Sequence, residues 1–215
     1  DNVARDLEAI RLALGETKLS YLGYSYGTLI GQRYLDLFGS NVRAMVLDGV
    51  MDPTKGFTDL LREQAIAFDA TLDRLFESCD RRANCPVDDL AATYDSVQRK
   101  VEEAPLPAGR HRVGPAELET AAIYAGYDPS LWADLADALA TADASTDDSA
   151  GTELWNMAQS YYDLGGYAAY AAVECLDSPH PTGSEAYEEF ADELRTLAPR
   201  IGGSIANEML VCAYW

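Results

Sequence analysis

The sequence predicts an α/β fold in which a short parallel strand-helix-strand unit precedes a long helical region. Two strand-like apolar segments, near residues 19–22 and at 42–50, flank a segment with helical character. Strands joined through a helix run parallel, with helices covering the sheet. Beyond the second strand the pattern is helical and almost no strand pattern remains. We therefore expect two regions, residues 1–53 with the strands and residues 54–215 built from helices.

The charge balance is strongly acidic, since 16 Lys and Arg residues against 36 Asp and Glu residues give a net charge of −20. Nucleic-acid binding requires a basic surface that displaces counterions, so we expect no nucleic-acid partner. An acidic surface attracts cationic groups, such as a free peptide N-terminus. Solubility in a secreted or high-salt setting is the simpler explanation of the acidic charge.

Hydropathy and the start of the sequence bear on location. The sequence has no stretch of about 18 apolar residues, so we expect no membrane-spanning helix. Asp1 opens directly on a helical pattern rather than on a signal peptide. We expect any secretion signal of the protein to lie outside this sequence.

Residues 2–14 form the first expected helix. Apolar residues recur at helical spacing, and Gly15 ends the pattern. An amphipathic helix of this kind buries its apolar stripe and exposes its charged side. The stripe comprises Val3, Leu7, Ile10 and Leu14, and the other side carries Arg5, Asp6, Glu8 and Arg11.

The most informative stretch is Gly-Tyr-Ser-Tyr-Gly at residues 23–27, between the first strand and a helix expected over 26–38. A Gly-x-Ser-x-Gly pattern at such a junction indicates a sharp turn that exposes a strained serine hydroxyl. The two glycines let strand and helix approach closely. Ser25 is therefore the candidate nucleophile, and the N–H of Tyr26, in the first helical turn, is the candidate oxyanion donor. A tight turn with an incidental serine is the alternative.

The second strand, residues 42–50, reads VRAMVLDGV and is expected to be buried. Asp48 and Asp52 lie at and just beyond its end. A carboxylate there can orient the base of a serine hydrolase. Asp48 followed by Gly49 fits a turn at a strand end as well.

Helical periodicity and Pro or Gly punctuation divide residues 54–215 into successive helices and loops, with no evident internal repeat. A Pro- and Gly-bearing loop is expected at 104–115 and a solvated acidic loop at 142–151. The expected helices cover residues 57–76, 90–101, 117–124, 131–139, 154–164, 167–175 and 185–197.

The four cysteines, an even number, fit disulfide bonds. Cys79 and Cys85 bracket a short polar loop that a bridge would close, which leaves Cys175 and Cys212 as the second pair. Zinc is the alternative, but Cys79 and Cys85 are spaced too widely for a zinc knuckle and no histidine is near in sequence. We expect disulfides, hence an oxidising compartment, and neither a metal nor a cofactor.

A serine nucleophile needs a base and an acid that orients the base. The two histidines are His111, in a basic loop, and His180, between two prolines. Either would serve as the base if the helical region closed over Ser25. A surface loop position without a catalytic role is the simpler interpretation of both.

Several motifs taken together resemble one known family. They are the segments DLEAIR at residues 6–11, LG at 14–15, GYSYGT at 23–28, VLDGV at 46–50 and DP at 52–53. On these residues the chain resembles secreted actinobacterial tripeptidyl aminopeptidases, which are α/β-hydrolases related to the proline iminopeptidases. The resemblance runs along the whole chain but corresponds to the middle of such an enzyme.

The resemblance implies an α/β-hydrolase core portion at residues 1–53 and an inserted all-helical cap domain at 54–215. It also implies a serine exopeptidase that releases short peptides or residues from free peptide N-termini through an acyl-enzyme on Ser25. In such enzymes the catalytic acid and base follow the cap, and a second oxyanion donor precedes the nucleophile. We therefore expect these groups outside the sequence, in the rest of the same hydrolase domain as a separate segment or chain.

Substrate recognition is expected to involve the cap. An aminopeptidase must pair the ammonium of its substrate with a buried carboxylate, a role that suits Glu174 or Asp177. A solvated helix end is the simpler explanation of both carboxylates. Tyr24 and Tyr26, beside the serine, are expected to shape the pocket floor unless their rings belong to the core.

Two other functions remain open. The same scaffold serves esterases and lipase-like hydrolases, which would turn over short acyl esters but no peptide anilide. The missing triad His and Asp also fit a noncatalytic fragment or subunit that binds peptides or complements a partner. On the family resemblance we expect a secreted protein with a peptide substrate, and no membrane partner.

Overall fold

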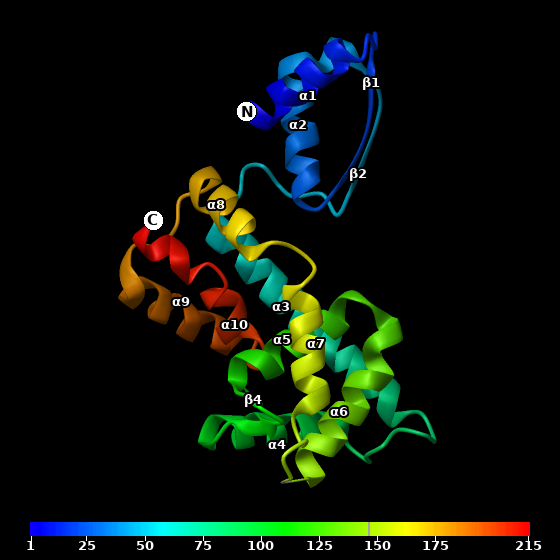
Figure 1. Ribbon diagram of the computed structural model, residues 1–215, viewed down its shortest axis with the longest axis vertical. Coiled ribbons are helices and arrows are strands. Elements are labelled where there is room, and N and C mark those ends of the chain that lie inside the picture. Colours follow the sequence, from blue (N-terminus) through cyan, green and yellow to red (C-terminus); the bar gives the residue numbers. More distant parts are fainter. Residues whose placement is uncertain (146) are drawn as a thin grey trace. The chain divides into compact units, whose positions relative to one another are not determined.

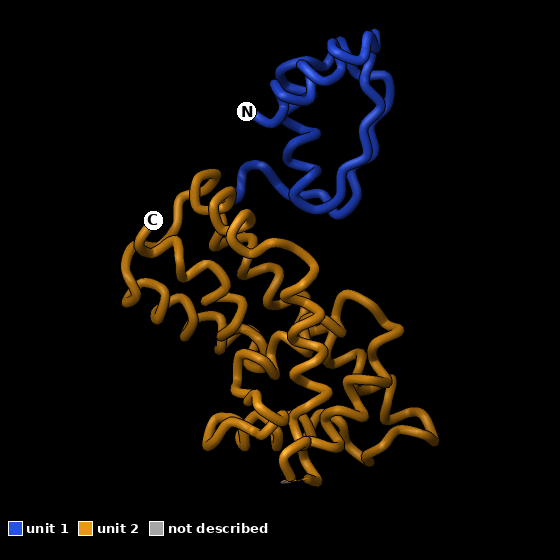
Figure 2. Tube along the Cα trace, viewed as in Figure 1, with its two compact units in different colours: residues 1–55 blue, residues 56–215 orange. Residues whose placement is uncertain are grey.

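The computed structural model describes residues 1–145 and 147–215, which form two compact units, Asp1–Lys55 and Gly56–Trp215 (Figure 2). The first unit contains the parallel strands, and the second is almost entirely helical (Figure 1). The predicted α/β fold class with a helical region after the second strand is confirmed. In the described part of the chain, no helix combines the length and apolar character needed to cross a membrane.

The first unit is a β-α-β unit with one additional helix before it. Its two strands pair in parallel, with Leu19 opposite Val42 at one end and Tyr24 opposite Asp48 at the other. Both helices lie on the same side of this sheet (Figure 1). The elements are α1 (Asn2–Ala13), β1 (Leu19–Tyr24), α2 (Tyr26–Phe38), the 3₁₀ turn η1 (Gly39–Asn41) and β2 (Val42–Asp48).

The prediction that the second strand is buried is wrong. α2 packs against one face of the sheet, but on the strands Leu22 is 56% exposed and Val46 is 58% exposed. Residues 1–55, all of which are described, supply helices to one face only. Side chains alternate between the two faces of a strand, so every second apolar residue stays in contact with solvent.

The first helix is correctly located, but its predicted inward face is wrong. Val3 and Ile10 are about half exposed, whereas the buried residues of α1 are Ala4 and Arg11. Arg11 donates from Nε and Nη2 to the Glu8 carboxylate, at 2.9 and 2.6 Å. The same carboxylate accepts from the Tyr34 hydroxyl on α2 at 2.6 Å. The Glu8 carboxylate, paired with Arg11 on the same helix, therefore joins α1 to α2 through the hydroxyl of Tyr34.

The second unit is organised around its longest helix, α3, which packs against α4, α5, α6, α9 and α10. Its elements are α3 (Phe57–Asp80), α4 (Leu90–Glu103), β3 (Leu106–Ala108), β4 (His111–Val113), α5 (Pro115–Tyr127), η2 (Pro129–Leu131), α6 (Trp132–Ala144), α7 (Thr152–Tyr162), α8 (Tyr167–Asp177), α9 (Gly183–Leu197), α10 (Gly202–Asn207) and η3 (Leu210–Tyr214).

The helices of the second unit enclose a single apolar core. Its large fully buried side chains are Leu72, Leu75, Phe76, Leu90, Tyr94, Leu118, Leu135, Leu139, Leu154 and Leu194. Most come from the apolar stripes that the sequence places at helical spacing. The buried Tyr94 hydroxyl is satisfied, since it donates to the Arg200 carbonyl at 2.8 Å.

Two predicted loops differ from the structure. Residues 104–115 include an antiparallel hairpin, β3 with β4, in which Ala108 pairs with His111. Gly109 allows this two-residue turn because its φ is +61°. Each strand has only three residues, too few to show alternation in the sequence. In the predicted acidic loop at 142–151, α6 continues to Ala144, and Thr146 lies outside the described residues.

Both disulfides join the cysteine pairs named from the sequence. Cys79 and Cys85 lie 5.2 Å apart between Cα atoms and close the loop after α3. Cys175 on α8 and Cys212 on η3 lie 5.3 Å apart. No cysteine is free in the described part of the chain.

Candidate active site

Ser25 occupies the turn between β1 and α2 and has φ 48° and ψ −118°. It is the sole residue other than glycine with a positive φ among the residues described. Such a conformation costs about 1–3 kcal/mol and persists only where surrounding contacts impose it. The turn is exposed, so its hydroxyl is accessible at the end of the sheet.

Backbone hydrogen bonds impose this conformation from both sides. The Ser25 N–H donates to the carbonyl of Asp48, at the end of β2, over 3.0 Å. The Ser25 carbonyl accepts from the N–H of Thr28 at 2.9 Å and from its hydroxyl at 2.6 Å. The fully buried Thr28 hydroxyl also accepts from the N–H of Met51 at 3.0 Å. Thr28 therefore ties the serine turn to the loop after β2.

The close approach of β1 and α2 requires glycine at some positions. Of the two glycines in the Gly-x-Ser-x-Gly motif, only the first is required. A Cβ on Gly23 would lie 2.6 Å from the Gly27 carbonyl oxygen, which is sterically forbidden. A Cβ on Gly27 would meet only the Tyr21 hydroxyl at 3.5 Å, an ordinary contact. Gly31 is the second tight position, with the Leu47 side chain at 2.7 Å from a Cβ there. The prediction is thus correct for Gly23 and wrong for Gly27.

The two tyrosines beside the serine have different positions. Tyr26 is the first residue of α2, so its N–H belongs to the turn at the positive end of the helix dipole. Tyr24 ends β1 and is 63% exposed, so its ring is not part of the core of the first unit.

Asp48 and Asp52 have structural partners. Asp48 ends β2, and its carbonyl accepts from Ser25 before Gly49 turns the chain with φ +64°. The Asp52 carboxylate accepts from the N–H and the hydroxyl of Thr54, at 2.9 and 2.7 Å. The hydrogen bonds from Thr54 lower the pKa of Asp52. The Asp52 side chain therefore forms a turn, whereas Asp48 contacts the serine turn through its backbone carbonyl.

The two histidines are held by the second unit. The His180 ring contacts the Glu174 carbonyl through Nε2 at 3.0 Å and the Tyr187 hydroxyl through Nδ1 at 3.4 Å. It also packs on Phe57, with ring centroids 4.3 Å apart. His111 stacks on Trp155 with centroids 4.3 Å apart and an angle of 12°. These contacts fit anchoring roles for both rings.

The predicted substrate-binding carboxylates lie on the last turn of α8. Glu174 is partly buried, and burial raises the pKa of its carboxyl, while His180 opposes that shift. Asp177 is exposed, and its charge adds to the upward shift in the pKa of Glu174. Ser25, Tyr24 and Tyr26 belong to the first unit, whereas these carboxylates belong to the second.

Glu208 is a candidate that the sequence analysis missed. It follows α10, and burial raises the pKa of its carboxyl, as does the charge of Glu174, while a hydrogen bond from Tyr170 opposes the shift. The Tyr167 hydroxyl donates to its carbonyl at 2.9 Å. Glu174 and Glu208 therefore lie near one another in a tyrosine-rich surround. The predicted bond between Cys175 and Cys212 was the available signal, because it brings these segments together.

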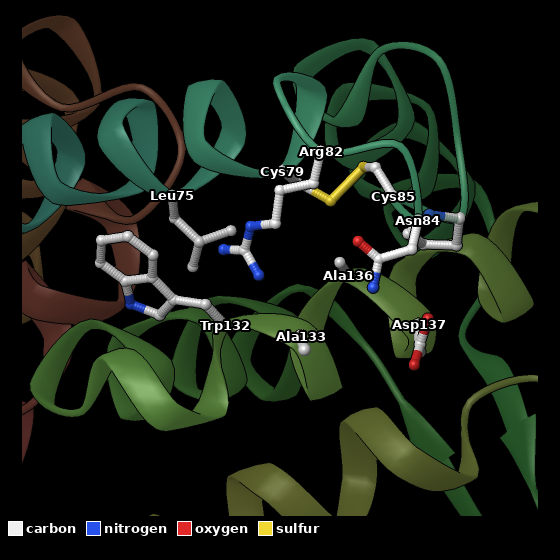
Figure 3. A pocket seen from close by; sticks show the side chains of 10 residues that line it. Leu75, Cys79, Arg82, Asn84, Cys85, Trp132, Ala133, Ala136 and Asp137 are labelled. Carbon is white, nitrogen blue, oxygen red and sulfur yellow. A yellow bond between two sulfur atoms is a disulfide. The ribbon is translucent and has the colours of Figure 1, made fainter.

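Two small cavities in the second unit involve none of these residues. One, of about 70 Å³, lies beside the Cys79–Cys85 disulfide, where Arg82 and Asn84 face Trp132 and Asp137 (Figure 3). The other, of about 340 Å³, lies between α5, α6 and α7. The first holds little more than a few water molecules and is too small for a peptide.

Known proteins are similar to this chain along its whole length. Residues 1–121 match the model of the alpha/beta hydrolase fold family. Aligned over all of this chain, the serine protease Hip1 of Mycobacterium tuberculosis is 31% identical. The tripeptidyl aminopeptidase of Streptomyces lividans is 34% identical and the carboxylesterase B of Mycobacterium tuberculosis 32% identical, again over all of this chain. The chain spans only 45%, 41% and 44% of these relatives, respectively.

Proposed function

Because the chain belongs to the α/β-hydrolase fold family, we propose that it carries the nucleophile of a serine hydrolase. The observation that supports this most directly is the strained backbone of Ser25 at a strand-to-helix turn, φ 48°. This is the geometry in which the fold presents a nucleophilic serine. The proposed enzyme is an exopeptidase that releases short peptides or residues from free peptide N-termini.

In the proposed reaction the Ser25 hydroxyl attacks the scissile carbonyl, and its proton passes to a base. The tetrahedral oxyanion accepts a hydrogen bond from the N–H of Tyr26 at the N-terminus of α2. Collapse of the intermediate expels the amine of the leaving peptide, which takes up the proton, and leaves an acyl-enzyme on Ser25. Water then hydrolyses this ester and restores the serine.

The base and the acid are proposed to lie outside these 215 residues, in the rest of the same hydrolase domain. Both histidines of the chain have anchoring contacts in the second unit, which supports this assignment. The exposed apolar face of the β1–β2 sheet supports it too, because parallel sheets are normally covered on both faces.

The second unit is proposed to be the cap domain, which covers the site and selects substrates. Glu174, with Asp177, is proposed to recognise the substrate ammonium, and the neighbouring carboxyl of Glu208 makes it a third candidate. A cation beside these carboxyls would favour their charged forms, against the burial that raises the pKa of Glu174 and Glu208. Tyr24 is proposed to contact the substrate beside the serine.

The two disulfides support a proposed location outside the cytosol, because such bonds persist in oxidising compartments. Secretion is accordingly part of the proposal.

The first experiment labels the full-length protein with a fluorophosphonate, which reacts with activated serines. We expect labelling of the wild type and of Ser20→Ala, a matched exposed serine on β1, but none of Ser25→Ala. Labelling that survives in Ser25→Ala would refute the assignment of the nucleophile.

A second experiment separates a peptidase from an esterase, an alternative favoured by the similarity to a carboxylesterase. The substrates are a free tripeptide anilide, its N-acetylated form and short acyl esters. Turnover of the free anilide well above the acetylated form is expected. Turnover of esters alone would replace the peptidase proposal with the esterase one.

A further inference from the structure

Helix α8, Tyr167–Asp177, is unusually exposed for its composition. Its sequence, YAAYAAVECLD, is apolar around most of its circumference. All of its residues are described, yet Ala171 is the single buried one. Val173 is 44% exposed and Leu176 73% exposed. An apolar helix normally owes its position to the surface that it buries, and α8 buries very little.

The neighbouring α9 shows the usual arrangement. It is more polar overall, but it buries Phe190, Ala191 and Leu194 in the core of the second unit, and Tyr187 is buried as well. The Tyr187 hydroxyl donates to the Met209 carbonyl at 2.7 Å, which fixes α9 to the segment before η3. The two helices therefore differ in how much packing holds them, since α9 buries several large side chains and α8 contributes only Ala171 and part of Cys175 to the core.

Few contacts attach α8 to the rest of the second unit. The covalent one is the bond from Cys175, in its last turn, to Cys212 on η3. The Tyr167 hydroxyl, in its first turn, donates to the Glu208 carbonyl at 2.9 Å, and Tyr170 hydrogen-bonds the Glu208 carboxylate. All three reach the short stretch from Glu208 to Cys212. One further contact joins the Glu174 carbonyl to the His180 ring at 3.0 Å, and that ring packs on Phe57 of α3.

The chain on either side of α8 permits it to move. Gly165 and Gly166 precede it, and a Cβ at either would meet no atom within 4 Å. After it, the segment 178–183 ends at Gly183, whose φ is +79°. Glycine pairs in open space are suited to absorbing the backbone rotation of a hinge.

We propose that α8 is a hinged lid helix latched by the Cys175–Cys212 disulfide, and that reduction of this bond releases it. A dithiol reductant supplies two electrons and two protons. The S–S bond breaks to two thiols while the dithiol closes to its own cyclic disulfide. The released helix then keeps its tyrosine hydrogen bonds to Glu208, the contact of the Glu174 carbonyl with His180 and the packing of Ala171. Water replaces the hydrogen bonds at little cost.

Release would change the candidate recognition site, a consequence that rests on the proposed function. Glu174 and Tyr170 travel with α8, whereas Glu208 precedes η3 and stays with the body of the second unit. Opening the latch therefore separates the two neighbouring carboxyls. A substrate ammonium that both recognise would bind more weakly after reduction.

The other disulfide provides a matched control. Cys79 and Cys85 are six positions apart in sequence and close the loop at the end of α3. α3 buries Leu61, Ala65, Leu72, Leu75 and Phe76 along its length, so packing holds it without the bond. Loss of this disulfide removes the same chemical cross-link without releasing a helix.

The test is hydrogen exchange followed by mass spectrometry on the full-length protein. Three forms are compared: the wild type, the double variant Cys175→Ser with Cys212→Ser, and the control Cys79→Ser with Cys85→Ser. We expect the amides of α8 to exchange at least ~10 times faster in the first double variant only, with α3 to α7 unchanged. Wild type treated with a dithiol should show the same increase, confined to α8.

Unchanged exchange of α8 after loss of Cys175–Cys212 would overturn the proposal. So would loss of protection throughout α3 to α7, including failure of this variant to fold, because the bond would then hold the whole unit. Kinetics on the free tripeptide anilide are measured in parallel, and a higher KM is expected without the latch. A wild type that hydrolyses nothing would refute the proposed function alone, since the exchange result does not depend on activity.

Discussion

The two units of the chain bury their apolar residues to very different degrees. In the second unit Leu72, Leu75 and Leu118 are at most 1% exposed, and helices surround the core. In the first unit Leu22, Val46 and Val50 are 56–61% exposed, and one face of the sheet is open. The nucleophile candidate thus belongs to the unit with the less complete core. From this difference we expect the second unit to fold by itself, and we propose that further strands complete the sheet of the first.

The largest expected effect comes from separating the units. Residues 56–215 alone should fold with a cooperative thermal transition and full helical circular dichroism, because their core is enclosed. Residues 1–55 alone should be largely unfolded, since so short a chain with one open sheet face buries too little apolar surface. A cooperative transition for residues 1–55 alone would show that the first unit needs no cover and would remove the contrast.

Substitution of large apolar residues by alanine tests the difference in apolar burial between the two units within the full-length protein. Leu75→Ala in the second unit should cost about 2–5 kcal/mol of unfolding free energy, because it leaves a cavity in a closed core. Leu22→Ala should cost about 2 kcal/mol or more, although Leu22 is exposed in this chain, if other strands and helices cover the sheet. Urea denaturation measures both. A change below about 0.5 kcal/mol for Leu22→Ala would mean that this face stays in solvent.

A smaller effect tests the tight turn of the first unit. Gly23→Ala should destabilise by about 1–3 kcal/mol, because its Cβ would overlap the Gly27 carbonyl. Gly23→Ala should also lower kcat, because the backbone displacement that relieves the overlap would move Ser25, two residues away. Gly27→Ala is the matched control, because its Cβ has room and alanine favours the helix by up to about 1 kcal/mol. Equal losses for the two variants, measured by thermal unfolding, would contradict this steric difference.

The smallest expected effect is a difference in pH dependence between the units. Arg11, Tyr34 and Asn41 hydrogen-bond Glu8 and lower its pKa from 4.5 to about 2. A carboxyl with a lowered folded-state pKa stabilises the fold above its unfolded pKa and loses that contribution as pH falls through the folded value. The first unit should therefore weaken between pH 4.5 and about 2, and Glu8→Gln should flatten that change.

In the second unit Glu119 behaves oppositely, since burial raises the pKa of its carboxyl. Its contribution is present at low pH and is lost as pH rises through the folded-state value. Stability measured against pH in the two single variants, Glu8→Gln and Glu119→Gln, should therefore change in opposite directions. Parallel changes would contradict the assignment of these two environments.

Most elements were predictable because their signals are local. Helical periodicity in the second unit predicted α3, α4, α5 and α9, and the Gly-x-Ser-x-Gly pattern predicted the turn at Ser25. The β3–β4 hairpin was missed because its strands are too short to show a period. α10 and η3 were missed because short segments near Cys212 carry no clear stripe. Glu208 was missed as well, because the residues that make it a candidate, Tyr170 and Glu174, are far from it in the sequence.

The amino-acid sequence alone determined the strand-helix-strand order, the serine between two glycines, the even number of cysteines and the acidic charge. These properties depend on residues close together in the chain, or on composition. The tertiary structure alone decided that Glu8 on α1 meets Tyr34 on α2, that Gly31 rather than Gly27 is tight, and that the Cys175–Cys212 bond joins α8 to η3. Each of these depends on which surfaces meet across the fold, and periodicity in one segment does not specify its partner.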